Sequence, residues 1–466
     1  MRENALSQWH EFKITGILTL ALVLIAVAGA MMSKFPTKFI LPAVAVSFLV
    51  ILTIKLPEVL LALFLNAGEL KNDPRFQLPV DLTLLLWILT ILSTYLWIKK
   101  GRIKLTMPPL KMALPFLSVC TITLISLIYT NNFVYGSDKA IKLVTLGTLA
   151  LFGSFYIMGD YKRVRNFMLT YIILAMAIMV DFFQKSHKPG SPVKVSITSN
   201  YLTMGSSMAY AFIMILLYFF MTDRSLIRRV LYLLAFSPAI LYVLILSGGR
   251  GPFIALIATM FFILTLGRRN TERKRIRIWV IIVIVVSGIY LSLDYRDFTR
   301  MTSRMMLLDE GGGRSVLERE WMAKSAFKAM TTMPYFFTGL GIGGFPRYYE
   351  GLDATGNMYN YPHNILLEMG AELGIFGLIS IVLFLYWSIR KGYSLAWKTS
   401  GDNFYTVAAM FSVYFFTVLT ALKSGDINDH RFLFALAGII YALDRNAGHV
   451  ESPNRKIGEG TEPCKS

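Results

Sequence analysis

The sequence predicts an all-α integral membrane protein with 12 to 14 transmembrane helices and one long loop outside the membrane. Of the 466 residues, 55% are apolar and only 16% are charged, whereas soluble domains carry about a quarter charged residues. The apolar residues form runs long enough to cross a hydrocarbon core about 30 Å thick, which needs about 20 helical residues. Aromatic residues reach 14%, which suits a protein with two interfacial belts.

The predicted spans follow one another with short connections over most of the chain. We expect them near residues 14–31, 37–54, 80–98, 109–129, 139–158, 166–183, 203–222, 230–247, 252–267, 276–293, 363–388, 402–422 and 430–443. The segment Pro57–Asn66 is too short for a full span and predicts a half-helix. We expect the first span to stay uncleaved, because so many spans follow it.

The distribution of the net charge of +19 predicts the orientation of the spans. Basic clusters occur in alternate loops, at residues 99–104, 162–165, 224–229, 268–277 and 390–398. Because cytoplasmic loops carry the excess of Lys and Arg, these loops and both termini are predicted to be cytoplasmic. The clusters therefore indicate topology and contact with lipid headgroups, and we expect no nucleic-acid partner.

This topology divides the chain into four parts. They are N-terminal transmembrane helices over 1–293, a periplasmic loop domain over 294–362, C-terminal transmembrane helices over 363–443 and a cytoplasmic tail over 444–466. The loop domain is too long for a passive connection. Within it, Arg314–Met330 contains no Pro or Gly and has apolar residues at Val316, Leu317, Trp321 and Phe327. It predicts an amphipathic helix that lies on the membrane surface or caps a cavity.

Polar residues at membrane depth or at its edge are informative because burying them is costly. The first such place is the segment Ser247–Pro252, at the predicted outer mouth between two spans. Gly249 and Gly251 allow the backbone to approach a ligand, and the guanidinium of Arg250 offers donors that match phosphate oxygens. The alternative is a tight turn between helices with an arginine that reaches the interface.

The second place is the start of the amphipathic helix, where a glycine tract precedes Arg314 and Arg319 follows. The tract could place an arginine over a cavity in the membrane, although a solvated helix face fits the composition equally well. Arg314 and Arg319 are five positions apart and therefore about 140° apart on a helix. They cannot both point at one ligand, and we favour Arg314 with Arg319 as the alternative.

The third place is the entry to the span after the long loop. We expect Pro362 in the first helical turn, which puts His363 beside free backbone N–H groups at the positive end of the helix. That field disfavours imidazolium, so the ring should be neutral and able to accept a proton, while the same amides help to hold an anion. Glu368 and Glu372 follow Asn364 by one and two turns as a polar stripe. The alternative for His363 is a surface or capping histidine.

Other motifs indicate which chemistry to set aside. The glycine-rich segment Gly339–Gly344 follows no predicted strand, so it does not fit a dinucleotide-binding fingerprint. No D-x-D pair is present, and the five histidines and two cysteines lack metal-ligand spacing. We therefore expect no metal and no cofactor. A loop containing Asp426, Asp429, His430 and Arg431 forms a second candidate polar rim.

Four motifs in this order resemble the O-antigen ligase/polymerase superfamily of bacterial envelope enzymes. They are SGGRG before a span, GGGR at the start of the loop helix, the P-x-x-x-x-G-L-G-x-G-G-F stretch from Pro334 to Phe345, and PHNILLEMGAELGIFG after the long loop. The resemblance covers residues 245–388. It implies a GT-C-like fold in the bacterial inner (cytoplasmic) membrane. It also implies transfer of a glycan from undecaprenyl pyrophosphate to an acceptor hydroxyl at the periplasmic face, without a metal.

The resemblance also implies roles for individual residues. The family's loop histidine falls on His363, its span-edge arginine on Arg250 and its loop arginine on Arg314. Arg319 stays the alternative, because the spacing from the arginine to the tryptophan is often shorter in the family than from Arg314 to Trp321. We expect His363 to act as the base and the arginines to hold the pyrophosphate. The predicted substrate-binding residues are Arg319, Asn364, Gly249 and Gly251.

These roles favour an inverting O-antigen ligase whose acceptor is lipid A-core, embedded in the lipid bilayer. Three other functions stay open. The first is a polymerase that joins lipid-linked repeat units into O-antigen or exopolysaccharide, with a glycan as acceptor, and the second is a protein O-oligosaccharyltransferase. The third is a transporter of lipid-linked glycans, which often has two related halves; the sequence has no such symmetry.

Overall fold

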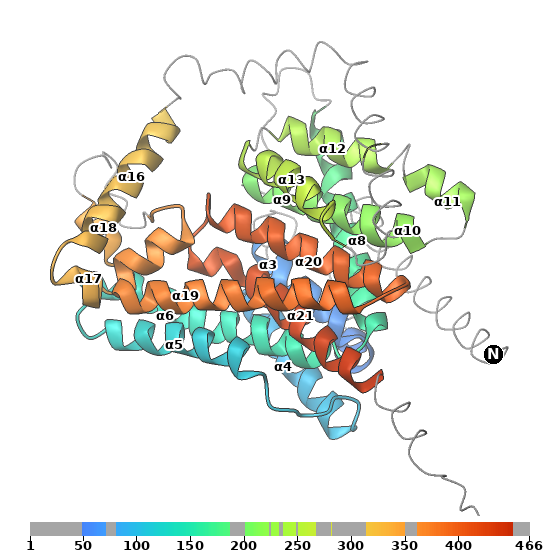
Figure 1. Ribbon diagram of the computed structural model, residues 1–466, viewed down its shortest axis with the longest axis horizontal. Coiled ribbons are helices and arrows are strands. Elements are labelled where there is room, and N and C mark those ends of the chain that lie inside the picture. The colour runs from blue at the N-terminus through green and yellow to red at the C-terminus, as the bar shows by residue number, and fades with distance from the viewer. Residues whose placement is uncertain are drawn as a thin grey trace, which may run out of the picture. The chain divides into compact units, whose positions relative to one another are not determined.

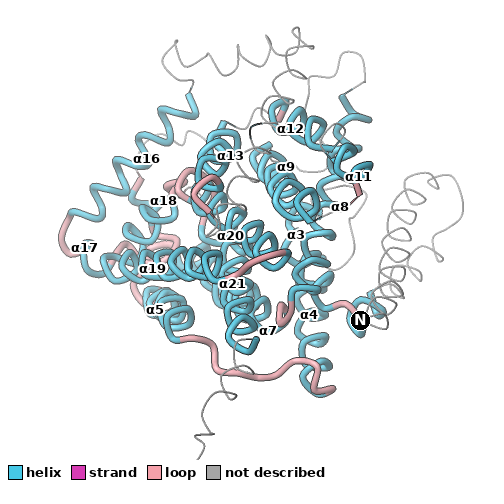
Figure 2. The backbone as a smooth tube through the Cα atoms, turned by 45° about the vertical axis from the view of Figure 1, so that its right-hand side comes forward, coloured by secondary structure: helices cyan, strands magenta, loops and turns pink. Residues whose placement is uncertain are grey.

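The computed structural model describes residues 49–70, 81–186, 201–222, 225–232, 236–247, 250–266, 281, 314–349 and 361–450. All regular secondary structure in these ranges is helical, so the all-α prediction is confirmed for them (Figures 1 and 2). The chain divides into two compact units, residues 1–56 and 57–466. The first unit contributes a helix over residues 49–55, and the second contains every labelled element.

The labelled elements include α-helices, π-helical turns and one 3-10 turn. In chain order they are α3 (Pro57–Leu70), α4 (Leu82–Lys99), α5 (Leu110–Ser126), α6 (Phe133–Lys142), η2 (Leu143–Gly147), η3 (Leu149–Gly153), α7 (Ser154–Ile157), α8 (Tyr161–Ser186), α9 (Tyr201–Met214), η4 (Ile215–Phe219), α10 (Phe220–Thr222), α11 (Leu226–Leu231), α12 (Ser237–Leu246), α13 (Arg250–Ile263), α16 (Arg314–Thr331), α17 (Tyr335–Thr338), α18 (Phe345–Tyr348), α19 (Ile365–Lys398), α20 (Asp402–Ala421), η6 (Ile427–His430) and α21 (Arg431–Val450).

Six helical segments in the described ranges are long and apolar enough to cross a membrane. They are Leu82–Lys99, Phe133–Ile157, Tyr161–Phe183, Leu202–Thr222, Ile365–Lys398 and Asp402–Ala421. Each matches a predicted span. Three shorter apolar helices are Pro57–Gly68, Leu110–Ser126 and Gly251–Ile263. The predicted total of 12 to 14 is not confirmed, and the predicted spans 14–31, most of 37–54 and nearly all of 276–293 lie outside the described residues.

Two predicted boundaries were wrong: one span begins earlier than predicted, and the span predicted to end at residue 388 continues as α19 to Lys398. The described parts of the predicted span 230–247 are helical and comprise the end of α11 and the helix α12. The span predicted to begin at residue 139 begins at Phe133, as α6, η2, η3 and α7 follow one another. The polar residues Asp138 and Lys139 had hidden its first turns from a hydropathy criterion.

Polar side chains at the N-caps explain where several helices begin. Asp81 accepts hydrogen bonds from the N–H groups of Thr83 and Leu84, at 2.8 and 3.1 Å, and so caps α4. Asn364 does the same for α19, and Asp426 forms a capping box on η6. Such caps satisfy N–H groups that have no partner inside the helix.

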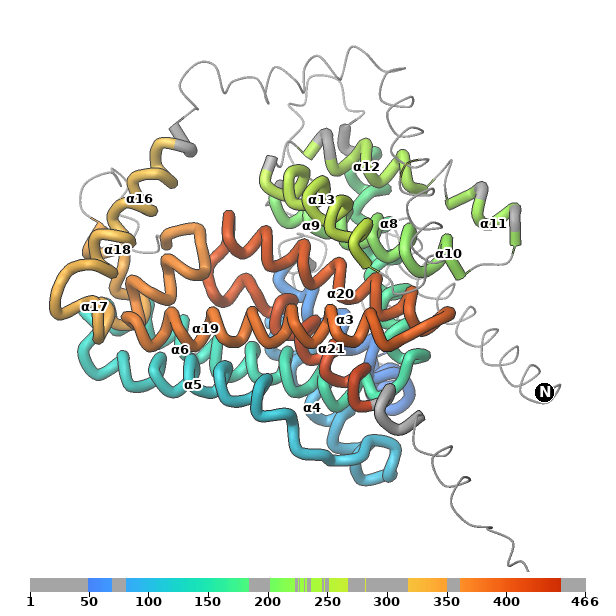
Figure 3. Tube along the Cα trace, in the orientation of Figure 1, coloured from blue at the N-terminus to red at the C-terminus, as the bar shows by residue number. Residues whose placement is uncertain are grey.

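Helix α19 is central to the packing of the second unit. It packs against α5 along its length and against α16, α17, α20 and α21 (Figure 3). It is bent at Gly374, whose backbone angles φ 68° and ψ −165° are not helical. We call the end of the bundle where α19 begins, with His363, Glu368 and the loop Leu422–His430, the His363 end. We call the opposite end, with Arg163, Lys391 and Arg445, the basic end.

The predicted helix in the long loop is observed as α16, and the face that packs on the bundle is not the one that contains Leu317, Trp321 and Phe327. Met322, Ala326 and Ala329 are buried in a cluster that includes Leu340 and Ala371. Leu317, Trp321 and Phe327 are instead about half exposed or more, at 49%, 55% and 61%. Small side chains on the buried face allow α16 to lie close to α19, which a face of aromatic residues would prevent.

Candidate active site

The glycine-rich segment Gly339–Gly344 packs against the start of α6 and the bend of α19. Gly341 and Gly343 have positive φ values of 82° and 69°, and a Cβ on Gly341 would lie 2.6 Å from the Cα of Thr130. The Oγ1 of Thr130 donates a hydrogen bond to the carbonyl of Ile342 at 2.8 Å. These glycines are therefore explained by close backbone packing, which agrees with setting aside the dinucleotide fingerprint.

The bend at Gly374 joins this segment to α19. A regular helix would use the carbonyl of Ala371 within its own hydrogen-bond ladder. Here the N–H of Leu340 donates to that carbonyl at 2.9 Å. A Cβ on Gly374 would overlap the carbonyl oxygen of Phe337. The motifs P-x-x-x-x-G-L-G-x-G-G-F and AELGIFG therefore form one packed unit, and it supports the first two turns of α19.

His363 lies immediately before the cap of α19, in a backbone conformation unusual for its type. Its φ is 56°, the only positive φ among the described residues other than glycine. The prediction that Pro362 occupies the first helical turn was wrong, because Asn364 is the N-cap and the helix begins at Ile365. The side chain of Asn364 accepts the N–H groups of Leu366 and Leu367, at 2.9 and 3.2 Å. Those amides are already used, so they are not the expected anion site.

The imidazole of His363 is half-buried, and one of its nitrogens has no hydrogen-bond partner. Its Nδ1 atom is buried without a hydrogen-bond partner, and its ring centroid lies 4.4 Å from that of Tyr361. Burial, and to a smaller extent the cation of Arg319, lower the pKa of His363 to about 4, and Asp426 opposes this shift. The ring is therefore neutral near pH 7, as the sequence predicted, but burial rather than the helix field is the main cause.

Of the two loop arginines, Arg319 has a described side chain, and its charge acts on His363. Arg319 is half-buried on α16 and lies seven residues, or about two turns, from the buried Ala326, so both side chains share a face. Arg314 is the first residue of α16, and its side chain lies outside the described residues. Because the two arginines are about 140° apart on the helix, the face of Arg314 differs from the face that packs on α19.

The other predicted phosphate-binding segment joins α12 to α13. Arg250 is the first residue of α13 and Gly251 the second, with open space around the Cα of Gly251. Gly249 and the side chain of Arg250 lie outside the described residues. Ser247 and Pro252 flank the segment and pack against Gly205 of α9, where an added Cβ would lie 3.1 and 3.3 Å from them.

Glu368 and Glu372 belong to a buried ionic cluster rather than an open polar stripe. The Nζ of Lys139 lies 2.5 Å from Glu368 Oε1 and 2.7 Å from Glu372 Oε2, and all three side chains are fully buried. Glu368 Oε1 also accepts the N–H of Ile427 at 3.2 Å. The cluster therefore joins α6, α19 and η6.

Sequence reasoning did not single out Lys139, although a signal was present. Lys139 lies at the head of a predicted span on the side opposite the basic loops, where the positive-inside rule does not explain a lysine. An ionisable residue at membrane depth needs a partner. Glu368 and Glu372, one helical turn apart and predicted at the same side of the membrane, are the carboxylates that could have been paired with it.

The loop before α21 contributes a second polar group to the His363 end. Asp426 Oδ1 accepts the N–H groups of Asn428 and Asp429, at 2.8 and 3.2 Å. Its other oxygen, Oδ2, accepts the hydroxyl of Tyr135 at 3.5 Å. The amide of Asn364 donates to the carbonyl of Leu422 at 2.9 Å, which fastens the start of α19 to the end of α20. The predicted polar rim therefore lies beside the predicted histidine.

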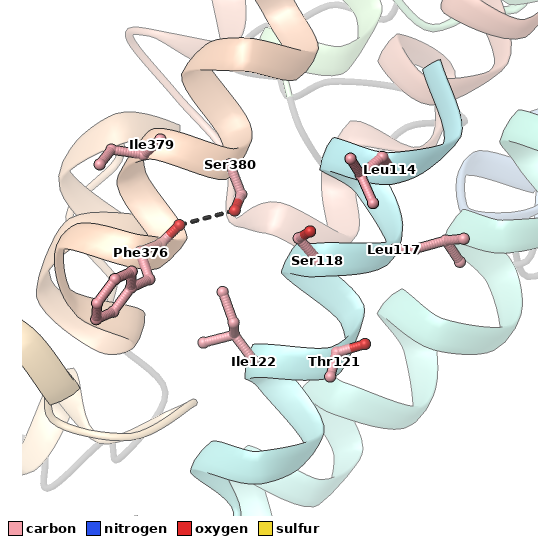
Figure 4. Close-up of a pocket in the computed structure, with 8 residues that line it drawn as sticks. All are labelled: Leu114, Leu117, Ser118, Thr121, Ile122, Phe376, Ile379 and Ser380. Carbon is pink, nitrogen blue, oxygen red and sulfur yellow. Dashed lines mark hydrogen bonds between the residues drawn. The ribbon is translucent and has the colours of Figure 1, made fainter. Parts of the chain in front are cut away.

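An open groove lies between α5 and α19 (Figure 4). Its volume is about 410 Å³, and it is lined mainly by apolar side chains, with the hydroxyls of Ser118, Thr121 and Ser380 among them. Ser380 donates to the carbonyl of Phe376 at 2.8 Å, so its hydroxyl is already satisfied. The groove is a hydrocarbon-compatible surface. Elsewhere in the described part of the chain, no group of three His, Cys, Asp or Glu residues could hold a metal ion.

Comparison with known proteins shows a family similarity for part of this site. Residues 234–382 match the family model described as O-antigen ligase. This stretch is similar to the O-antigen ligase family. The resemblance found in the sequence motifs is thus confirmed, and the matched range contains Arg250, Arg314, Arg319 and His363. No curated protein matches the sequence.

The similarity of residues 234–382 to the O-antigen ligase family, together with six apolar helices long enough to span a bilayer, indicates a multi-pass membrane protein. The family match suggests glycan transfer of the O-antigen ligase type and lipid-linked glycan substrates. Lys139, Tyr135 and Asp426 lie outside the matched range. The His363 end is thus assembled partly from the family stretch and partly from helices that precede and follow it.

Proposed function

We propose that this protein is an O-antigen ligase of the bacterial inner membrane. In this proposal it transfers a glycan from undecaprenyl pyrophosphate to a hydroxyl of lipid A-core at the periplasmic face, with inversion and without a metal. The observation that carries the proposal is the neutral, half-buried imidazole of His363, with a buried, unpartnered Nδ1 and the cation of Arg319 in electrostatic range. A base beside a cation is what this transfer needs.

One base and one cation site are enough for the transfer: the base takes the proton of the acceptor, and the cation site stabilises the leaving group. His363 accepts the proton of the acceptor hydroxyl, the acceptor oxygen forms a bond to C1 of the donor sugar, and the bond from C1 to the pyrophosphate oxygen breaks. The pyrophosphate leaves with the electron pair, and arginine side chains stabilise its charge. Attack from the face opposite the leaving group inverts the anomeric centre. The two-carboxylate scheme of glycosidases is not required.

A pKa near 4 makes His363 a weak base in the free protein. We expect the bound donor to raise this pKa. The pyrophosphate brings negative charge next to the imidazole, which favours the imidazolium and raises the pKa of His363. The base therefore becomes stronger when the donor is bound, which brings its pKa closer to the working pH. In the free protein the neutral ring also avoids a second buried cation beside Arg319.

For the pyrophosphate ligands we propose Arg250 together with one loop arginine. Arg319 is favoured for the second place because its charge acts on His363, and Arg314, preferred from the sequence, is the alternative. Asn364 acts indirectly in this scheme, because its side chain is used to cap α19 and to bond Leu422. Gly249 and Gly251 are proposed to let the backbone near Arg250 approach the phosphates.

The experiment that tests the proposal is glycan transfer by the purified protein in liposomes, with a lipid-linked glycan as donor and lipid A-core as acceptor. We expect His363→Ala to lower the rate by about 10²–10⁴-fold. His449→Ala, in the last turn of α21, should leave the rate unchanged and serves as the control. Retained transfer in the His363→Ala variant would overturn the mechanism.

The lipopolysaccharide ladder of a deletion strain separates ligase from polymerase. Loss of all glycan on the core, with accumulation of lipid-linked polymer, is the result expected for a ligase. A core that carries a single repeat unit would instead indicate a polymerase. A normal ladder would contradict both assignments.

A further inference from the structure

The buried ionic cluster of Lys139, Glu368 and Glu372, here called the Lys139 cluster, has three charged groups, whereas an ion pair has two. One ammonium and two carboxylates are fully buried, so the cluster carries a net charge of −1 when all are ionised. Glu368 Oε2 and Glu372 Oε1 are also buried without a hydrogen-bond partner. Buried ion pairs often contribute little net stability, because desolvation offsets the attraction between the charges. Stability alone therefore does not explain why two glutamates share this lysine.

The two glutamates differ in what else they contact. Both bind the Nζ of Lys139 at similar distances, 2.5 and 2.7 Å. Glu368 Oε1 additionally accepts the N–H of Ile427, the first residue of η6. Glu368 is thus the member of the cluster that joins α19 to the loop before α21.

That loop and the start of α19 together surround His363. Ile427 directly follows Asp426, whose charge acts on His363 and whose Oδ2 accepts the hydroxyl of Tyr135. The backbone N–H of Glu368 donates to the carbonyl of Asn364 at 2.9 Å, next to His363. One side chain and its own backbone therefore connect both elements that flank the imidazole.

We propose that Glu368 is a positioning residue for the transfer reaction, which holds the Asp426 loop against α19 and thereby fixes the surroundings of His363. Lys139 fixes the carboxylate in turn by binding the same oxygen that accepts the N–H of Ile427. The inference rests on the proposed function, because it assigns Glu368 to the geometry of the proposed base. Glu368 itself does not touch the substrate in this scheme.

Glu372 provides a matched control one helical turn away. Glu368→Leu and Glu372→Leu remove the same carboxylate from the same lysine, and each leaves a neutral pair of Lys139 with the other glutamate. Only Glu368→Leu removes the acceptor of the Ile427 N–H. In Glu368→Gln the amide oxygen can still accept that N–H, so this variant tests rescue of the connection without the charge.

The first readout is steady-state glycan transfer by the full-length protein in liposomes. We expect Glu368→Leu to lower kcat by about 10–100-fold, with KM within about 3-fold, because small displacements of catalytic groups cost about this much. Glu368→Gln should retain most of the rate, and Glu372→Leu should stay within about 3-fold of the unchanged protein. Equal losses of kcat in the two leucine variants would overturn the proposal.

The pH dependence of kcat/KM distinguishes positioning from a general loss of folded protein. The groups that face His363 are Arg319 from α16, Asp426 from the loop and the neighbouring Tyr361. If the loop detaches in Glu368→Leu, His363 becomes less buried, its pKa rises toward the ordinary value, and the acid limb moves to higher pH. Loss of folded protein alone would lower the rate at every pH without moving that limb. A folded Glu368→Leu variant whose rate falls while the limb stays in place would contradict the proposal.

A second readout does not depend on activity. Diethylpyrocarbonate modifies neutral, accessible imidazoles, and mass spectrometry gives its rate at His363. We expect this rate to rise severalfold in Glu368→Leu and to stay unchanged in Glu372→Leu and Glu368→Gln. If the unchanged protein transfers no glycan, the proposed function fails while this rate still tests the positioning. If Glu368→Leu does not fold, the rate of His363 modification in Glu368→Gln tests the proposal instead. A rate as low as in the unchanged protein supports the proposal, and a rate raised severalfold overturns it.

Discussion

The two ends of the helical bundle hold their cations in different ways. At the basic end, Lys391 pairs with Asp444 at 2.9 Å, and their side chains are 30% and 27% exposed. Arg163 pairs with Asp160 at 3.1 Å and is likewise partly exposed. At the His363 end, the ammonium of Lys139 is fully enclosed by two carboxylates. Cations that reach water can serve topology alone, whereas an enclosed cation must be matched by fixed partners and therefore fixes geometry.

The glycines of the two ends also differ in how closely they are packed: those at the basic end lie in open space, and those at the His363 end lie against neighbouring backbone. Gly101 and Gly401, at the basic end, have positive φ values and no atom within 4 Å of an added Cβ. Gly339, Gly341 and Gly343, at the His363 end, also have positive φ values, but an added Cβ on each would collide with backbone atoms of a neighbouring segment. Glycine at the basic end thus serves the turn itself, while glycine at the His363 end serves the turn and the contact.

The largest expected difference between the ends is in the free energy of unfolding that is lost when one lysine at each end is replaced. Lys139→Met leaves two buried carboxylates without their cation and should lower the free energy of unfolding by about 3–5 kcal/mol. Lys391→Met breaks a partly exposed pair and should cost about 0–1 kcal/mol. Thermal unfolding of both variants in the same detergent measures the contrast. Similar losses in the two variants would show that enclosure of Lys139 has no special energetic role.

Most of the helices could be predicted from the sequence because hydropathy depends on local composition. The spans near 80–98, 166–183, 203–222 and 402–422 agree closely with the observed helices. The early start at Phe133 could not be predicted, since Asp138 and Lys139 lower the local hydropathy and the partners of Lys139 come from α19, far along the chain.

The sequence identified the residues of the candidate site, but it did not identify which groups each of them contacts. His363 and the arginines were identified from motifs, and the neutrality of the imidazole was inferred from a helix field. The structure attributes that neutrality mainly to burial, with Arg319 as the nearby charge. Burial depends on how the Asp426 loop and α16 fold over α19, which a one-dimensional pattern does not contain. The same limit explains why Glu368 and Glu372 were interpreted as a stripe rather than as partners of Lys139.

A smaller contrast is expected from alanine at one glycine of each end. Gly341→Ala and Gly401→Ala both place a side chain at positive φ, which costs about 1 kcal/mol. Gly341→Ala also forces a Cβ to within 2.6 Å of the Thr130 backbone, so we expect its loss of unfolding free energy to be about 2 kcal/mol larger. Chemical denaturation of the two variants gives the difference. Equal losses would mean that Thr130 moves away without cost.

The smallest expected effect concerns pH and separates the two loop arginines. The imidazole must be neutral to act as a base, so kcat/KM should fall only as the pH drops through about 4, the pKa of His363 in the free protein. Arg319→Gln removes a cation that lowers this pKa, so the acid limb should move to higher pH. Arg314→Gln should lower kcat/KM only to the extent that Arg314 binds phosphate, and it should leave the limb in place. A limb that moves in Arg314→Gln but not in Arg319→Gln would reverse the assignment. It would also show that the face of α16 packed on α19 is not the face that meets the donor.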